Sequence, residues 1–108
     1  MKIRSVLLLS LTLATAAQAA DEAAAELWTA KCKSCHGPDG RAQTQMGKKE
    51  SIVDISQPAW QQAQTDADIR EVIADGSPRN KKMKAYKDKL TPEQIDSLVT
   101  YIRTLKKG

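Results

Sequence analysis

The sequence is poor in aromatic residues, in histidine and in long apolar segments. Its 108 residues include two Trp, two Tyr, one His and no Phe. A small chain with so few aromatic residues for a core generally needs a disulfide, a metal or another staple to fold stably. After the first 20 residues no apolar run is long enough to cross a bilayer, which argues against a multi-span membrane protein. No segment alternates apolar and polar residues as a strand does, so a fold built on a sheet is not expected.

Residues 1–19 have the features of a secretory signal. Lys2 and Arg4 are followed by a short apolar stretch and by an Ala-Gln-Ala cleavage site that ends at Ala19. A retained membrane anchor is the alternative, but the apolar stretch is short for a span. We therefore predict cleavage after Ala19, which leaves residues 20–108 as one soluble domain. In a bacterium this domain would lie in the periplasm.

The most specific motif is Cys-Lys-Ser-Cys-His at residues 32–36. Two cysteines three residues apart lie on one helical turn, where Cys32 and Cys35 can each form a thioether to one edge of a porphyrin. His36 then lies under the iron, and C-x-x-C-H is the attachment signature of c-type haem. A bare C-x-x-C pair could also be a redox-active dithiol or half of a zinc site. The adjoining histidine favours haem, and zinc would need about four ligands where this cluster supplies three.

Helix signals elsewhere in the chain are local and well separated. Thr65 and Thr91 are suitable N-caps, Gly76 is suited to end a helix, and apolar residues recur at helical spacing near the C-terminus. We predict three helices, over residues 21–35, 66–75 and 92–105. The long intervening segments are predicted to be loops, at residues 41–59, wrapping the haem with one helical turn near 49–54, and at residues 77–90.

These features together resemble the small bacterial class I cytochromes c, which are monohaem electron carriers. The resemblance covers nearly all of the mature chain. Trp28 lies four residues before Cys32, and the C-x-x-C-H motif is followed by Gly37. The resemblance continues through the short helix that ends at Gly76. The remaining matching segments are residues 83–86, 90–95 and 98–103.

The resemblance implies an all-α, cytochrome c-like domain wrapped around one covalently bound haem c. In such proteins the first and last helices cross, and Ala24, Trp28 and Tyr101 fall at the positions of the crossing. The family usually has Gly where this chain has Ala24. It often has Met-Pro where this chain has Met83 and Lys84.

The resemblance also implies the ligands of the haem iron. His36 would be one axial ligand, and because it is the only histidine, bis-histidine ligation within one chain is excluded. Met83 is the candidate for the sixth position by family register, and it lies in an otherwise polar loop. Met46 is the other methionine of the mature chain, and a lysine or an open position are further alternatives. Trp60 either contacts the haem, by packing or by donating to a propionate, or serves only in core packing.

The number and distribution of charged residues predict which kinds of partner the protein binds. Without Lys2 and Arg4, 15 basic residues remain against 13 acidic residues, so the net charge is small. No basic run alternates with aromatic residues as a nucleic-acid site does, so no nucleic acid is expected. If Met83 is a ligand, the basic loop would surround the exposed haem edge and steer acidic redox partners. A solvated loop with no partner is the other interpretation. The lysines of this loop are Lys81, Lys82, Lys84, Lys87 and Lys89.

The sequence therefore predicts a soluble, monomeric one-electron carrier that cycles between ferric and ferrous iron and is not an enzyme. A haem c subunit dedicated to one oxidoreductase complex is the first alternative, because the sequence does not separate it from a diffusible carrier. The second alternative is a secreted thiol–disulfide oxidoreductase that uses Cys32 and Cys35. That activity normally requires a βαβ context, for which the sequence has no signal.

Overall fold

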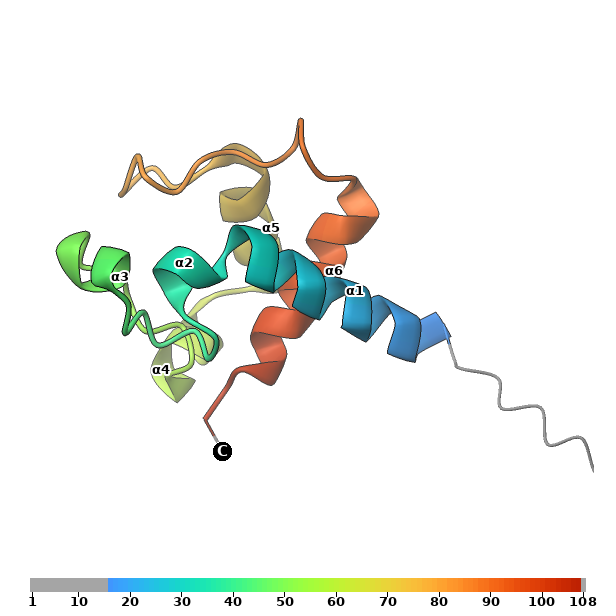
Figure 1. The fold of residues 1–108 in the computed structure, drawn as a ribbon, viewed down its shortest axis with the longest axis horizontal. Helices are drawn as coiled ribbons and strands as arrows, with labels where there is room; N and C mark the ends of the chain where they lie inside the picture. The colour runs from blue at the N-terminus through green and yellow to red at the C-terminus, as the bar shows by residue number, and fades with distance from the viewer. Residues whose placement is uncertain (1–15, 108) are drawn as a thin grey trace, which may run out of the picture.

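A computed structural model of the protein describes residues 16–107, which form six helices and no strand (Figure 1). The helices are α1 (Ala16–Lys31), α2 (Lys33–His36), α3 (Gln45–Lys49), α4 (Pro58–Ala63), α5 (Asp66–Asp75) and α6 (Pro92–Thr104). The predicted all-α class is confirmed. Within the described range, no helix has both the length and the apolar character that spanning a bilayer requires.

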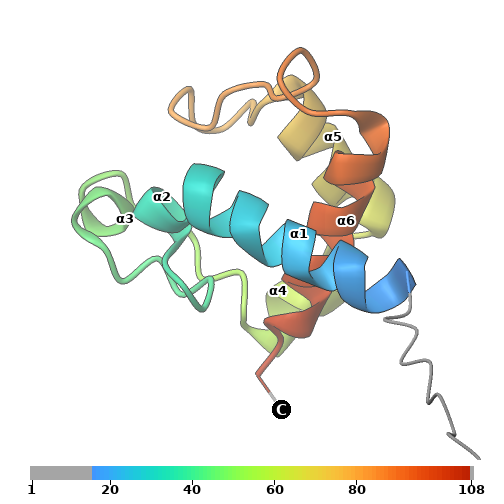
Figure 2. The same ribbon diagram turned by 45° about the vertical axis from the view of Figure 1, so that its right-hand side comes forward.

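The centre of the fold is the crossing of α1 and α6 (Figures 1 and 2). Ala24 and Trp28 face the crossing and are each only 2% exposed. The Trp28 ring lies 5.5 Å from the ring of Tyr101, measured between centroids. The predicted crossing residues are therefore confirmed, and the crossing accommodates the methyl group of Ala24 where the family usually has Gly.

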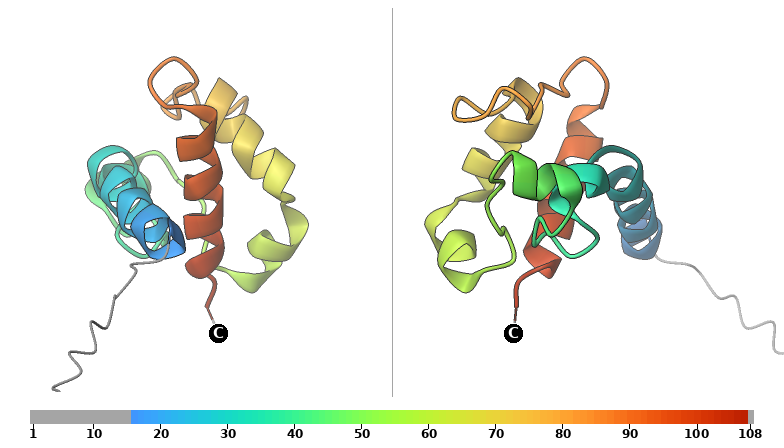
Figure 3. Two further views of the ribbon diagram at one scale, coloured as in Figure 1. Left: turned by 90° about the vertical axis from the view of Figure 1, so that its right-hand side faces the viewer. Right: turned by 60° about the vertical axis from the view of Figure 1, so that its left-hand side comes forward.

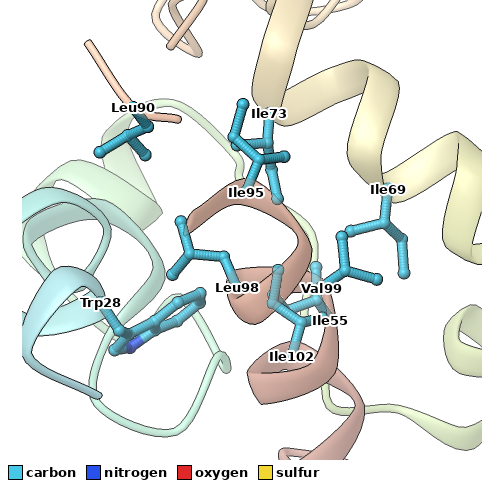
Figure 4. Packing of buried hydrophobic residues seen from close by; sticks show 9 residues of the cluster. All are labelled: Trp28, Ile55, Ile69, Ile73, Leu90, Ile95, Leu98, Val99 and Ile102. Atoms are coloured by element: carbon cyan, nitrogen blue, oxygen red, sulfur yellow. The ribbon is translucent and has the colours of Figure 1, made fainter. Parts of the chain in front are cut away.

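On its other side, α6 packs against α5, so that α6 lies between α1 and α5 (Figure 3). Leu98 is 1% exposed and Val99 is 3% exposed, and their side chains lie among those of the neighbouring helices (Figure 4). Complete burial of one such aliphatic side chain stabilises a fold by about 1.5–3 kcal/mol. The buried cluster consists of Trp28, Ile55, Ile69, Ile73, Leu90, Ile95, Leu98, Val99 and Ile102.

The helix starts predicted at Thr65 and Thr91 are confirmed in detail. The Thr65 hydroxyl accepts from the backbone N–H of Asp68, and the Asp68 carboxylate accepts from the Thr65 N–H. Thr91 and Gln94 form the same reciprocal pair at the start of α6. Each arrangement satisfies donors that a helix start otherwise leaves without partners.

The first helix differs from the prediction at both ends: it begins earlier, and it ends before Cys32. The helix begins at Ala16 rather than at residue 21, because the alanine-rich segment before Asp21 consists mostly of strong helix formers. It is interrupted at Cys32, although the Cys32 N–H still donates to the Trp28 carbonyl. The predicted cleavage point after Ala19 lies near the start of α1. Most of the predicted signal, residues 1–15, lies outside the described residues.

The loop predicted over residues 41–59 is wrong in part, because it contains the short helix α3 and the first two residues of α4. Thr44 caps α3 by accepting from the Gly47 N–H, and Pro58 begins α4 at the position where proline is best tolerated. The helical turn expected near residues 49–54 is therefore found earlier, at residues 45–49. The loop predicted over residues 77–90 is confirmed.

Candidate functional site

The C-x-x-C-H motif begins at Cys32, directly after α1, and includes all of α2. Cys32 and Cys35 are half-buried free thiols with no disulfide between them. Burial raises the pKa of Cys32 to about 11, and the neighbouring Cys35 adds to the rise. Cys32 is therefore a protonated thiol at neutral pH. Redox-active dithiols instead lower the pKa of the attacking cysteine, so this environment does not suit thiol–disulfide exchange.

His36 is the last residue of α2, and its imidazole is largely enclosed. Burial lowers the pKa of His36, so the ring is neutral at pH 7. Its Nδ1 atom is buried and has no hydrogen-bond partner among the described residues. A neutral imidazole is the form in which histidine binds metals.

The short helix α3 packs directly on the backbone of α2. The Thr44 hydroxyl donates to the Cys35 carbonyl oxygen at 2.8 Å and accepts from the Gly47 N–H at 2.8 Å. A Cβ atom at Gly47 would lie 2.8 Å from the Cys35 carbonyl oxygen, so this approach requires glycine. The sequence analysis missed both residues, although Thr44 has the chemistry of an N-cap. These contacts hold the Cys35 carbonyl group, within the motif, in place.

The loop that carries Met83 is hydrogen-bonded to the residue that precedes the motif. The Tyr86 hydroxyl donates to the Lys31 carbonyl oxygen at 3.3 Å, next to Cys32. Burial raises the pKa of Tyr86, and the nearby thiols Cys32 and Cys35 contribute to this rise. Figure 2 shows this loop in orange, above α2 and close to α5. One hydrogen bond thus connects the loop of Met83 to the residue that precedes Cys32.

Further hydrogen bonds hold the rest of this loop in place. The Asn80 side chain donates to the Glu50 carbonyl oxygen at 3.4 Å, just after α3. The Ser77 N–H donates to the Met83 carbonyl oxygen at 3.1 Å, and the Tyr86 N–H donates to the Ile73 carbonyl oxygen at 2.9 Å. The backbone after Met83 is therefore anchored to α5, and Met83 itself is hydrogen-bonded to the start of the loop.

The two methionines of the described chain lie in different environments. Met83 is half-buried and packs against the hydrophobic cluster. Met46 is 37% exposed on α3. The choice of Met83 over Met46 as a ligand stays a prediction.

Comparison with known proteins identifies the family. The sequence matches the cytochrome c family over residues 22–106, which is most of the chain. The chain belongs to the cytochrome c family. It is a c-type cytochrome and an electron carrier, with covalently bound haem c as its cofactor.

Solved structures have the same fold. The cytochrome resembles the KustC0563 c-type cytochrome with a TM-score of 0.71 and 36% identity, over 78% of this chain and 98% of that chain. A variant of Kustc0563 matches with a TM-score of 0.68 and 35% identity, over 77% of this chain and 98% of that chain.

A curated relative is the Cbb3-type cytochrome c oxidase subunit FixP of Azorhizobium caulinodans. It is 31% identical over 84 residues, which cover 78% of this chain. The cytochrome spans only about a quarter of that relative's length, 27%.

The residues of the site fit haem c. Two half-buried thiols one helical turn apart match the two attachment points of the porphyrin. His36 directly follows Cys35, and its lowered pKa keeps the imidazole neutral, so that one ring nitrogen can bind iron. The half-buried Met83 lies on a loop that is hydrogen-bonded to the residue preceding Cys32 through Tyr86. Nitrogen and thioether donors are together a ligand set found in cytochromes c.

Trp60 lies on α4, where it is half-buried and packs against the core cluster. No described residue accepts a hydrogen bond from its indole. Core packing is therefore observed, and a haem contact stays a prediction. The helix is held by Arg103 of α6, whose guanidinium donates to the carbonyl oxygens of Gln61 and Gln64, each at 2.6 Å. Sequence analysis missed Arg103, because its partners lie about 40 residues away along the chain.

The five loop lysines of the cytochrome fall into two groups. Lys87 forms an ion pair with Asp75 at 3.4 Å, and the Lys89 ammonium lies 5.8 Å from the ring centre of Tyr86. The other group is exposed and forms no ion pair within residues 16–107. Its members are Lys81, Lys82 and Lys84.

Proposed function

We propose that this cytochrome is an exported, soluble one-electron carrier with haem bound through Cys32 and Cys35 and iron held by His36 and Met83. The observation that carries the proposal is the hydrogen bond from Tyr86 to the Lys31 carbonyl oxygen. This bond joins the loop of Met83 to the residue before Cys32. It supports a single site for the two candidate axial ligands, which are separated by 47 positions in the sequence.

Haem c supplies a one-electron couple between ferric and ferrous iron. The chain's own residues would tune this couple. The thioether of Met83 is a soft donor that favours the ferrous state, and the apolar cluster beside it disfavours the extra charge of the ferric state. With His36 and Met83 as the two axial ligands, no position on iron remains for a substrate. We therefore infer electron transfer without enzymatic chemistry.

An export signal would explain the basic and apolar residues at the N-terminus of the sequence. We infer that residues 1–19 direct the chain to the periplasm of a bacterium and are removed after Ala19. The mature protein would then begin at Ala20. Covalent attachment through Cys32 and Cys35 would take place after export, in the same compartment.

The partners we infer are acidic redox proteins that bind briefly to a monomer. Support comes from the exposed ammonium groups of Lys81, Lys82 and Lys84, which have no internal ion pair in the described chain. Free positive charges beside the site would raise the rate of encounter with an acidic surface. Lys87 and Lys89 contribute less in this proposal, because Asp75 and Tyr86 already engage them.

A second candidate function is that of a haem c subunit dedicated to one oxidoreductase complex. It is favoured by one observation, the 31% identity to the oxidase subunit FixP. A subunit would be purified in a stable complex, whereas a carrier would be recovered alone from the periplasm. The thiol–disulfide oxidoreductase alternative is not supported, because the Cys32 thiol is protonated at neutral pH and residues 16–107 contain no strand.

The test is the visible spectrum and the mass of the exported protein. After co-expression with a haem-attachment system, the reduced-minus-oxidised spectrum should be that of low-spin haem c. The denatured protein should begin at Ala20 and retain one haem after acid–acetone extraction. A denatured mass equal to that of the bare polypeptide would contradict attachment through Cys32 and Cys35.

A further inference from the structure

We propose that Trp28 is a positioning residue for the axial histidine: its indole N–H fixes the carbonyl group of Gly37, the residue after His36, and thereby the orientation of the imidazole. The proposal rests on the proposed function, in which His36 is an iron ligand. Its first support is one hydrogen bond. Trp28 Nε1 donates to the Gly37 carbonyl oxygen at 2.9 Å.

This hydrogen bond is shielded from water. Trp28 is 2% exposed, and Gly37 is also buried. If the indole N–H were removed, the Gly37 carbonyl oxygen would lose a partner at a place that solvent does not reach. Buried polar groups in this situation are costly, so the bond strongly favours one arrangement of the peptide. The residue directly after His36 is therefore tied to the middle of α1.

The backbone on both sides of this peptide is also constrained. The His36 carbonyl oxygen accepts from the Ala42 N–H at 2.8 Å. Gly37 has a φ of +78°, a conformation that side-chain-bearing residues rarely adopt. Two consecutive carbonyl groups are thus held in fixed directions: that of His36 by Ala42 and that of Gly37 by Trp28.

The imidazole has no comparable support of its own. Metal-binding histidines generally donate their second ring nitrogen to a partner that sets the ring orientation. In the described chain Nδ1 of His36 is buried without such a partner. The ring instead lies 5.8 Å from the Trp28 ring, at an interplanar angle of 41°. Trp28 therefore holds His36 twice, through the backbone and by packing against the ring.

This role needs tryptophan and not only an aromatic residue. A phenylalanine at position 28 could still pack against Tyr101 at the crossing of α1 and α6. It would offer no donor to Gly37. The two contributions of Trp28, packing and donation, can thus be separated by substitution.

The experiment compares holoproteins that differ at position 28. One is Trp28→Phe, and the other carries β-(3-benzothienyl)alanine at this position, which keeps the indole shape and replaces N–H by sulfur. Three quantities are measured in the folded protein: the reduction potential, the paramagnetically shifted haem methyl resonances of the ferric state, and backbone amide exchange. The control is Val99→Ala, which removes buried volume from α6 at a residue 3% exposed.

We expect both position-28 variants to change the pattern of haem methyl shifts and to shift the potential. Exchange of the Ala42 amide should accelerate at least tenfold more than exchange of amides in α5. Val99→Ala should accelerate the protected amides together and leave the methyl pattern unchanged. If the benzothienyl variant matches the wild type, or if Trp28→Phe only reproduces Val99→Ala, the positioning role is refuted.

A separate variant distinguishes failure of this inference from failure of the proposed function. If His36→Ala retains the low-spin spectrum of the wild type, His36 is not a ligand and both proposals fall. If His36→Ala loses that spectrum while the position-28 variants are unaltered, the proposed function stands and only the role of Trp28 is refuted.

Discussion

Arg103 links three segments of the fold, and its removal should be costly. The guanidinium donates to the carbonyl oxygens of Gln61 and Gln64 at 2.6 Å and pairs with Asp66 at 2.8 Å. Arg103→Met keeps most of the aliphatic stem and removes all of these contacts. A hydrogen bond from a charged donor contributes about 1.5–3 kcal/mol when buried. The two carbonyl groups are only partly buried, so water would replace part of the loss.

The ion pair with Asp66 adds little, because its carboxylate is 65% exposed and exposed pairs contribute about 0–1 kcal/mol. We therefore expect Arg103→Met to lower the free energy of unfolding by about 2–4 kcal/mol. Urea unfolding of the holoprotein, followed by far-UV circular dichroism, measures this loss. With an m-value of about 2 kcal/mol per molar urea, the middle of the usual range, the midpoint should fall by about 1–2 M.

Arg70 provides a matched control. It forms an ion pair with Asp96, and the two side chains are 47% and 55% exposed. Arg70→Met should cost no more than about 1 kcal/mol. Arg103→Lys, which keeps the charge but loses the planar array of donors, should fall between the two. If Arg103→Met costs no more than Arg70→Met, the reasoning from the partly buried carbonyl groups of Gln61 and Gln64 is wrong.

Other outcomes can be checked independently. Cys35→Ala should leave at most one thioether, so the yield of holoprotein should fall sharply and a wild-type yield by denaturing mass analysis would contradict attachment there. Replacing three exposed loop lysines with Gln should slow electron transfer to an acidic partner in stopped-flow assays and flatten its salt dependence, because the Debye length falls from about 10 Å at 0.1 M to about 3 Å at 1 M. The three lysines are Lys81, Lys82 and Lys84. Lys106→Gln is the control, and an equal effect per charge would reject a docking role. Partial burial of Asp54 opposes its ionisation, but hydrogen bonds such as that from Ser56 and the charge of Lys107 outweigh it and lower its pKa. Asp54 thus contributes stability above its unfolded pKa of about 3.9 that is lost as pH falls through the lower folded pKa. Asp54→Asn should remove this part of the acid dependence of urea midpoints, and an unchanged dependence would exclude the contribution.

The parts of the fold that sequence predicted well are those set by local chemistry. Thr65 and Thr91 cap their helices through residues only three positions away, so the signal lies in a short stretch of sequence. The C-x-x-C-H motif has similarly short range. Helix α3 was missed because it has five residues and contains glycine, a poor helix former. Its stability comes from its contact with the Cys35 carbonyl group, which no local pattern reveals.

The candidate site residues come from the motif and from family register and stay a prediction, whereas the hydrogen bonds around them could not be predicted from sequence. Met83 was predicted from its register in the family, whereas the hydrogen bond of Tyr86 that joins its loop to Lys31 spans 55 positions. The lysines of the loop appeared equivalent in sequence. The folded structure distinguishes them, because Lys87 forms an ion pair with Asp75 of α5.

The central claim, that His36 and Met83 hold the iron, is tested most directly by the far-red sulfur-to-iron charge-transfer band of the ferric protein. The band should be present in the wild type and in Met46→Ala and absent in Met83→Ala. The reduction potential should fall in Met83→Ala, because the soft thioether that favours ferrous iron is lost. A band that survives in Met83→Ala and vanishes in Met46→Ala would contradict the account.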